Sequence, residues 1–257
     1  MTSPFSLRER VILITGGGQG IGLALAKFAI SSGARVALVE INPDVAAAAV
    51  VELGENNAHA YIGNVVDEIF VKETVADIVG RFGTLDGLIN NAGIVRAAML
   101  HKMTLQEWRQ VLDVNLTGCF VCLQAVATHF IEKSKQGAKR PRSIVNVSSV
   151  AGKRGTFGQI NYGSAKAGVL GLTMSAAREL SRYNINVNSI CFGAVETAMT
   201  ETIRQEQFRD KYLQQIPLAR FSTPEEIAPA TCFLLSEAAS YITGQHLSVD
   251  GGFHMDA

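Results

Sequence analysis

The chain has 257 residues, of which 47% are hydrophobic, with 24 glycines and only 6 prolines. Lysine plus arginine and aspartate plus glutamate both number 23, so the charge indicates neither a nucleic-acid partner nor an acidic solvated tail. The chain opens without a basic start and a long apolar run, and no window holds about 18 uncharged apolar residues for a membrane helix. We expect one cytoplasmic domain over residues 1–257 that acts on a small molecule, without nucleic-acid or membrane partners.

Short β-branched runs alternate with helical patterns along the whole chain. This alternation is typical of successive βαβ units, and it predicts an α/β fold with a doubly wound, parallel seven-stranded sheet and helices on both faces. The predicted strands are Arg10–Ile14, Arg35–Glu40, Ala58–Ile62, Leu85–Ile89, Ser143–Val147, Asn186–Cys191 and His246–Val249.

The first predicted strand runs into the glycine-rich segment Thr15–Gly22, and an apolar-periodic helix follows through Phe28. This order directs free backbone N–H groups and a helix amino end at a phosphate. The segment lacks the G-K-[ST] of a nucleoside triphosphate loop. The pattern therefore indicates a dinucleotide, with a glycine-rich turn that holds no ligand as the alternative.

The second predicted strand ends at Glu40. A carboxylate there can accept hydrogen bonds from the adenosine ribose hydroxyls and would repel a 2′-phosphate. NAD is therefore predicted as the preferred cofactor over NADP, and a solvated acid at a strand end is the alternative. After the third strand, Asn64 and Val65 are candidates for the adenine edge, unless Asn64 caps its own backbone.

The cysteines Cys119, Cys122, Cys191 and Cys232 lie in apolar segments, so we expect them to be reduced and buried. The five histidines have no metal-ligand spacing, and no metal site is predicted.

Tyr162 and Lys166 are four residues apart in a predicted helix, so their side chains share one face. A phenol with a pKa near about 10 becomes a useful acid or base when a nearby positive charge favours the phenolate. Lys166 can supply that charge. By themselves the two residues are weak evidence, because at this spacing a packed ring beside a solvated amine is the more common arrangement.

Six motifs in order, from Arg8 to about Phe253, resemble the classical short-chain dehydrogenase/reductase family. They are the glycine-rich segment, Asn-Asn-Ala-Gly at 90–93, Asn115 in Asp-Val-Asn-Leu, Ser149 in Asn-Val-Ser-Ser, Tyr162-x-x-x-Lys166, and Val-Asp-Gly-Gly at 249–252. The resemblance implies a Rossmann-type fold and a catalytic set of Asn115, Ser149, Tyr162 and Lys166. Ser149, and not Ser148, is chosen by its distance of thirteen residues from Tyr162.

Local patterns and the resemblance together give the predicted cofactor contacts. They are Thr15, Gly16, Gly18, Gln19, Gly20, Ile21, Gly22, Glu40, Asn64, Val65, Asn91, Ala92, Gly93, Tyr162, Lys166, Gly193, Val195 and Thr197. One position departs from the family, because Phe192 stands where Pro usually precedes Gly193. This departure places an aromatic ring near the nicotinamide or the substrate.

The expected chemistry is the interconversion of a secondary alcohol and a ketone. Hydride transfer from a reduced nicotinamide to a carbonyl leaves an alkoxide, so the site needs a proton donor, a second donor and a tuning cation. Tyr162, Ser149 and Lys166 fill these roles, and Asn115 positions a water. A dinucleotide-sensing protein without turnover is the alternative of another class.

The substrate is the least determined part. Residues 194–220 are predicted to form an amphipathic lid over an apolar substrate, or else a helix pair packed on the domain. Within the family, three segments, 91–96, 158–162 and 216–220, resemble the 3-oxoacyl-acyl carrier protein reductase branch, which generally prefers NADPH. A ketone or alcohol, including an acyl thioester, is the expected substrate.

Family resemblance also implies a homotetramer. Helices over 116–132 and 161–181 would pair across one interface and the last strand across another. Val169, Leu172 and Ala176 are compatible with this pairing, although a buried helix within the chain would show the same pattern.

Overall fold

The computed structural model describes residues 3–255, in which seven strands form one parallel sheet with the order β3-β2-β1-β4-β5-β6-β7. Their bounds are β1 Val11–Thr15, β2 Arg35–Glu40, β3 Ala58–Ile62, β4 Gly87–Asn90, β5 Arg142–Ser149, β6 Ile185–Phe192 and β7 His246–Val249. Strands β1, β4, β5 and β6 are buried along their whole length, as expected for a parallel sheet covered on both faces.

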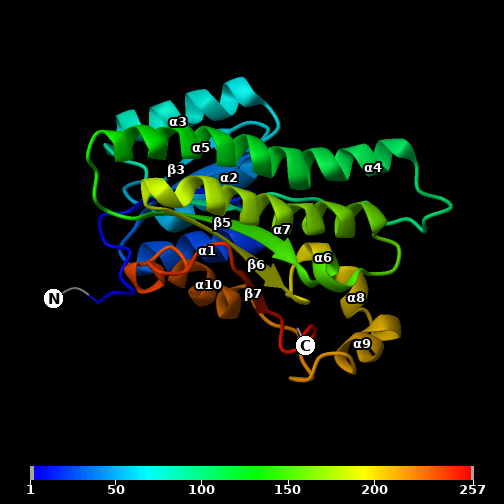
Figure 1. Cartoon of the computed structure of the whole chain (residues 1–257). Coiled ribbons are helices and arrows are strands. Elements are labelled where there is room, and N and C mark those ends of the chain that lie inside the picture. Colours follow the sequence, from blue (N-terminus) through cyan, green and yellow to red (C-terminus); the bar gives the residue numbers. More distant parts are fainter. Residues whose placement is uncertain (1–2, 256–257) are drawn as a thin grey trace.

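Helices cover the two faces of the sheet in separate layers (Figure 1). On one face, α1 (Gly20–Ser31), α2 (Pro43–Leu53) and α10 (Pro224–Phe233) contribute to one apolar cluster. On the other face, α3 (Glu68–Phe82), α5 (Gly118–Lys135) and α7 (Ile160–Leu180) contribute to a second cluster. The predicted doubly wound α/β fold is confirmed.

Shorter helices surround the carboxyl edge of the sheet. They are α4 (Leu105–Leu112), α6 (Val150–Arg154), α8 (Glu201–Arg204) and α9 (Glu206–Leu213). Helix α4 also contacts α7. The helix starts follow from local sequence: Asn42 and Asp67 accept backbone N–H groups at the starts of α2 and α3, and Thr104 with Glu107 forms a capping box at α4.

The stretch Leu105–Lys135 is helical throughout, and it is long and apolar enough to meet the length and composition of a membrane span. Half of its most apolar window is buried inside the protein, where α5 packs on the sheet. Core helices of globular proteins have the same composition. The stretch is interrupted by one π-helical turn at Asp113–Thr117, which includes Asn115.

The strand order reverses between β1 and β4, so the chain leaves the sheet in opposite directions on either side of this point. Ligands of open α/β sheets bind outside the carboxyl ends of the strands at such a reversal. The segments after β1, β4, β5 and β6 all lie at this edge, and they include the predicted glycine-rich segment and Ser149.

All four cysteines are free and buried, as predicted from their apolar segments. Burial raises the pKa of the Cys119 and Cys122 thiols to about 12, so neither is a reactive thiolate near neutral pH.

Candidate active site

A cavity of about 450 Å³ lies at the carboxyl edge of the sheet. One end is lined by the glycine-rich segment and the end of β2, and the other end is lined by Ser149, Tyr162 and Lys166. The cavity therefore joins the predicted dinucleotide segment to the predicted catalytic residues in one continuous space.

The glycine-rich segment has the shape of a phosphate cradle. Gly20 has φ 53°, and a Cβ placed there would point across the cavity toward Thr197, whose Cγ2 would lie 3.7 Å away. Helix α1 begins at Gly20, and within residues 3–255 the Gln19 side chain makes no capping bond to its first N–H groups. Uncapped N–H groups at the positive end of a helix suit a pyrophosphate, so these residues fit a dinucleotide.

The glycine-rich segment is fixed from behind by the residues that follow β4. Thr15 Oγ1 accepts hydrogen bonds from the backbone N–H groups of Asn91 and Ala92, both at 3.0 Å. Asn91 Nδ2 donates in turn to the carbonyls of Thr15 and Gly16, both at 3.1 Å. These bonds hold the Asn91-Ala92-Gly93 segment directly against the glycine-rich segment.

Glu40 is buried at the end of β2, with 6% of its surface exposed. Its Oε2 accepts from the backbone N–H of Gly18 at 3.2 Å, and its Oε1 accepts from Ile41 at 3.0 Å and Asn42 at 3.3 Å. Both carboxylate oxygens are thus engaged with backbone of this chain. Glu40 connects the glycine-rich segment to the turn after β2.

Ser149 ends β5, and its Oγ accepts from the backbone N–H of Ala151 at 3.1 Å, which caps α6. Ser148 differs, because its hydroxyl donates to the carbonyl of Lys166 at 2.8 Å. Burial raises the pKa of Tyr162, and a hydrogen bond with Ser149 acts in the opposite direction. The phenol therefore stays protonated near neutral pH in this form of the protein.

Lys166 is buried, with 3% of its surface exposed. Its Nζ donates to the carbonyl of Val147 at 2.8 Å and lies 5.7 Å from the centre of the Tyr162 ring. The shared helical face of Tyr162 and Lys166 is therefore as the sequence predicts. Burial lowers the pKa of Lys166 to about 8.

Asn115 lies in the π-helical turn and is 1% exposed. Its Oδ1 accepts from the backbone N–H of Ile94 at 2.8 Å, and its Nδ2 donates to the carbonyl of the same residue at 3.0 Å. Ile94 lines the cavity, whereas Asn115 lies one layer behind it. The side chain fixes the segment after β4 on the substrate side.

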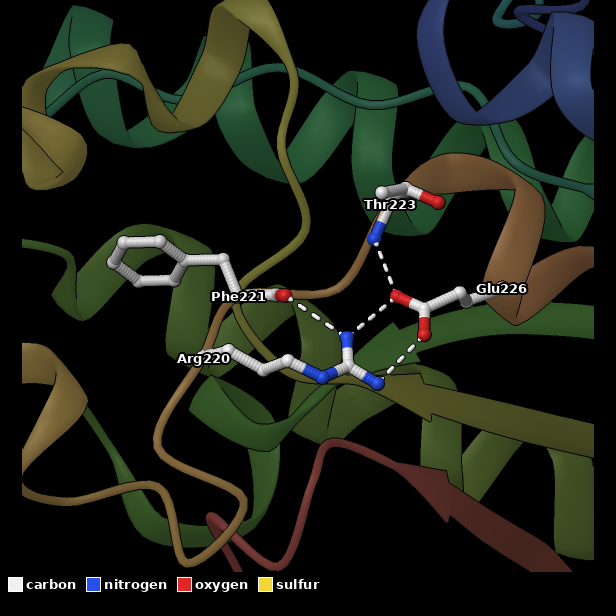
Figure 2. A network of polar contacts seen from close by, with 4 residues as sticks. All are labelled: Arg220, Phe221, Thr223 and Glu226. Atoms are coloured by element: carbon white, nitrogen blue, oxygen red, sulfur yellow. Dashed lines mark hydrogen bonds and ion pairs between the residues drawn. The ribbon is translucent and has the colours of Figure 1, made fainter.

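The predicted lid region leaves β6 and returns to the body at Ser222. Val195 pairs with Ser222, and Ala194, Ile216 and Phe221 form a small apolar cluster separate from the two main ones. Figure 2 shows the closing network, in which the Arg220 guanidinium bonds both oxygens of Glu226 at 2.7 and 2.6 Å and the Phe221 carbonyl at 3.2 Å.

Most of the predicted site residues line the cavity. The exceptions are Thr15, Gly18 and Asn115, which support its wall from behind. Sequence reasoning did not assign the further lining residues Val39, Ile41, Gly63, Ile94, Val114, Val147, Ser148, Ala198, Met199 and Thr200. Many of them directly adjoin an assigned motif, so chain adjacency was the available signal. Phe192, the departure noted in the sequence, also lines the cavity.

A family model described as Enoyl-(Acyl carrier protein) reductase matches residues 16–254. The 3-oxoacyl-[acyl-carrier-protein] reductase FabG of Thermotoga maritima is 42% identical over 248 residues, covering 96% of this chain and 98% of the relative. The chain belongs to the short-chain dehydrogenase/reductase family. It is an oxidoreductase that acts on CH–OH and keto groups with a nicotinamide dinucleotide.

Other members of the short-chain dehydrogenase/reductase family are also similar. The FabG of Aquifex aeolicus is 39% identical over 249 residues, covering 96% of this chain and 98% of that relative. A solved gluconate 5-dehydrogenase from Burkholderia cenocepacia, in complex with NADP and tartrate, has 31% identity and a TM-score of 0.91 over 97% of each chain. A solved putative gluconate dehydrogenase from Agrobacterium tumefaciens has 29% identity and a TM-score of 0.92 over 98% of each chain.

The prediction that this short-chain dehydrogenase/reductase prefers NAD is wrong. The similar solved protein from Burkholderia cenocepacia holds NADP. The prediction rested on a Glu40 carboxylate free to receive ribose hydroxyls and to repel a 2′-phosphate. In the structure that carboxylate is buried and accepts three backbone N–H groups, so its position at the strand end does not decide the cofactor.

Proposed function

We propose that the chain is an NADPH-dependent reductase of 3-oxoacyl thioesters. The observation that carries the proposal is one cavity that joins a phosphate cradle to Ser149, Tyr162 and Lys166. Relatives named as 3-oxoacyl-[acyl-carrier-protein] reductases, about 40% identical over nearly the full chain, support the substrate class. NADPH is supported by the NADP complex of a similar solved protein.

The dinucleotide supplies a hydride when it is bound. Its pyrophosphate would be held by Gly16–Gly22 at the start of α1, its adenosine by Asn64 and Val65, and its nicotinamide end by Gly193, Val195 and Thr197. Lys166 supplies an ammonium at the same end of the cavity for the adjoining ribose hydroxyls. All of these residues except Gly17 and Gly18 line the cavity.

Tyr162 donates the proton that the carbonyl oxygen needs on reduction. Its raised pKa keeps the phenol protonated, and Ser149 offers a second hydroxyl to hold the same oxygen. For oxidation of an alcohol the phenol must lose its proton, which burial opposes. The bare site therefore holds Tyr162 in the protonated form that ketone reduction uses.

The substrate end of the cavity is lined by the apolar side chains of Ile94, Phe192, Val195 and Met199. These residues suit an acyl chain better than a polyhydroxylated sugar acid. We propose that residues 194–220 act as the lid over this chain. Sugar-acid oxidation is the second candidate, because the similar solved proteins are named as gluconate dehydrogenases.

The test is turnover of a substrate panel with NADPH and with NADH. The panel contains a 3-oxoacyl thioester and an enoyl thioester, each with the reduced cofactors, and gluconate, which is an alcohol to be oxidised and is therefore assayed with NADP⁺ and NAD⁺. We expect NADPH consumption with the 3-oxoacyl thioester and its loss by more than about a hundredfold in Tyr162→Phe. Tyr162→Phe with undiminished turnover would refute the proton-transfer scheme, and a wild-type chain that binds NADPH without turning over any substrate would be a dinucleotide sensor.

We also propose a homotetramer located in the cytoplasm, as the family resemblance implies. Val169 and Ala176 cannot form the subunit contact, because they are buried inside the chain. Phe120 on α5 and Met174 on α7 are instead 43% and 47% exposed, so they are the better candidates for the contact between subunits.

A further inference from the structure

Asn161 directly precedes Tyr162 and is fully buried, with 0% of its surface exposed. Its Oδ1 accepts from the backbone N–H of Tyr162 at 2.8 Å. Its Nδ2 donates to two carbonyls, that of Arg96 at 3.0 Å and that of Glu107 at 3.2 Å. One amide therefore joins the first turn of α7, the segment after β4, and α4.

This amide acts on the same segment that Asn115 holds. Asn115 bonds both backbone groups of Ile94, and Asn161 bonds the carbonyl of Arg96, two residues further along. The backbone N–H of Ala98 then donates to the carbonyl of Gly158 at 2.8 Å, just before α7. The 94–98 segment is thus fixed at three points, Ile94, Arg96 and Ala98, and the last two are held by residues close to Tyr162 in the chain.

An asparagine is well suited to this position. Its amide presents two N–H donors on one side and an oxygen acceptor on the other, and it bonds two carbonyls and one N–H here. An aspartate would accept the Tyr162 N–H but would face the two carbonyls with a carboxylate. An alanine would leave three part-buried backbone groups without these bonds.

We propose that Asn161 is a positioning residue for the reaction, which sets Tyr162 relative to the cavity wall at Ile94. The inference rests on the proposed function, in which Tyr162 donates the proton. Proton transfer needs the phenol within hydrogen-bond distance of the carbonyl oxygen, and displacements of about 1 Å lower rates by about a hundredfold. Asn161 fixes both sides of that distance, the helix that carries the phenol and the segment that borders the substrate.

The test compares Asn161→Ala and Asn161→Asp with the matched variants Asn188→Ala and Asn188→Asp. Asn188 is also a buried asparagine, 1% exposed, whose Nδ2 donates to the Ile242 carbonyl at 2.8 Å and whose Oδ1 accepts from the Gln245 N–H at 3.0 Å. It is absent from the lining of the cavity within the described chain. Rates are expressed per NADPH-binding site, measured by titration of NADPH fluorescence, so that loss of folded protein is not counted as loss of activity.

We expect kcat to fall about tenfold to a hundredfold in both Asn161 variants. The pH dependence of kcat should also shift, because the burial that raises the pKa of Tyr162 and its bond with Ser149 depend on where the ring lies. The affinity for NADPH should stay at the wild-type value, and the Asn188 variants should keep the wild-type kcat and pH profile.

Three results would overturn the inference. They are a wild-type kcat and pH profile in both Asn161 variants, an equal loss in the Asn188 variants, and wild-type behaviour of Asn161→Asp alone. The last would mean that Asn161 only caps α7. Activity in Tyr162→Phe would refute the proposed function itself, whereas an inactive Tyr162→Phe beside fully active Asn161 variants would refute only the positioning role.

Discussion

Glu40 illustrates how the partners of a side chain decide its role. Its position at the end of β2 is the one expected for a ribose-binding acid, yet its oxygens accept the N–H groups of Gly18, Ile41 and Asn42. A sequence displays the carboxylate but not the backbone groups that will face it after folding. The residue was therefore located correctly at the cavity and interpreted wrongly.

Glu40→Ala should weaken NADPH and NADH binding together and leave their ratio nearly unchanged. The substitution leaves three N–H groups without their acceptor, and a buried unpaired group costs about 1–3 kcal/mol. We therefore also expect a loss of stability of that order in chemical denaturation. Cofactor titration by fluorescence provides the binding constants. If Glu40→Ala lost binding of NADH alone, the result would instead support a direct contact between Glu40 and the ribose hydroxyls.

Lys166 should make the stability of the cofactor-free protein depend on pH. Its pKa falls from 10.5 in the unfolded chain to about 8 in the folded one, so between these values the unfolded chain binds more protons. Stability must then rise with pH in that interval, by about 2 kcal/mol from pH 7 to 9.5. Denaturation of wild type and Lys166→Met at both pH values measures this term, because other titrating groups cancel in the difference. If the difference in stability between wild type and Lys166→Met were the same at pH 7 and at pH 9.5, the pKa of Lys166 in the folded chain would not be lowered into this interval.

Among the elements, the strands were the easiest to predict. The bounds of β2, β3 and β7 are as predicted; β2 is a nearly continuous buried apolar run, and β3 and β7 are the part-exposed edge strands of the sheet. Strand β5 was predicted to end at Val147, but Ser148 and Ser149 also pair, with Cys191 and Phe192 of β6. Phe192 keeps the backbone N–H that a proline would lack, so β6 also extends one residue further than predicted.

The π-helical turn at Asp113–Thr117 was not predicted. Its residues have ordinary helix-compatible sequence, and the turn coincides with the two bonds that the Asn115 amide makes to Ile94. Long-range contacts of this kind leave no periodic pattern in the sequence. The resemblance to a family singled out Asn115, but the contact with Ile94 came only from the structure.

The lid should loosen when its closing ion pair is removed. In the network of Figure 2, Glu226 bonds the Arg220 guanidinium and also accepts from the Thr223 backbone N–H at 3.0 Å. The Arg220 bond, followed by the Thr223 bond, lowers the pKa of Glu226, so the pair persists at mildly acidic pH. Glu226→Ala should therefore increase proteolytic cleavage within 198–222 and raise the KM for the acyl substrate, with NADPH affinity unchanged.

Glu52→Ala is the matched control for the lid, because Glu52 on α2 pairs with Lys27 on α1, and neither residue belongs to the lid or to the network of Figure 2. It should leave both the cleavage pattern and the KM at wild-type values. Equal cleavage of wild type and Glu226→Ala within 198–222 would show that the lid is held by its apolar cluster, and not by the Arg220 pair.

For the whole molecule, the parallel sheet places the ends of four strands at one edge, so that distant motifs converge on a single cavity. This convergence follows from strand order, and motif order along the chain was sufficient to predict it. The outer surface is different, because a helix buried within a chain and one buried between chains have the same apolar pattern. Val169 and Ala176 fitted a subunit contact and a buried helix equally for that reason, and they are internal.

The exposed face of α7 offers a direct test of the proposed tetramer. Met174 is 47% exposed, and a Cβ added at Gly171 would meet nothing within 4 Å, so this side of the helix is open along the chain described here. In a tetramer that pairs α7 helices, Met174→Glu would bring one charge from each of two subunits into the same apolar contact. We expect the mass of Met174→Glu by light scattering to fall from that of four chains to that of two chains or one. Ile69→Glu on α3 is the control, because Ile69 is 70% exposed in the chain, and this variant should keep the mass of four chains. A wild-type chain that is monomeric would refute the tetramer, and a tetrameric Met174→Glu protein would exclude α7 from the interface.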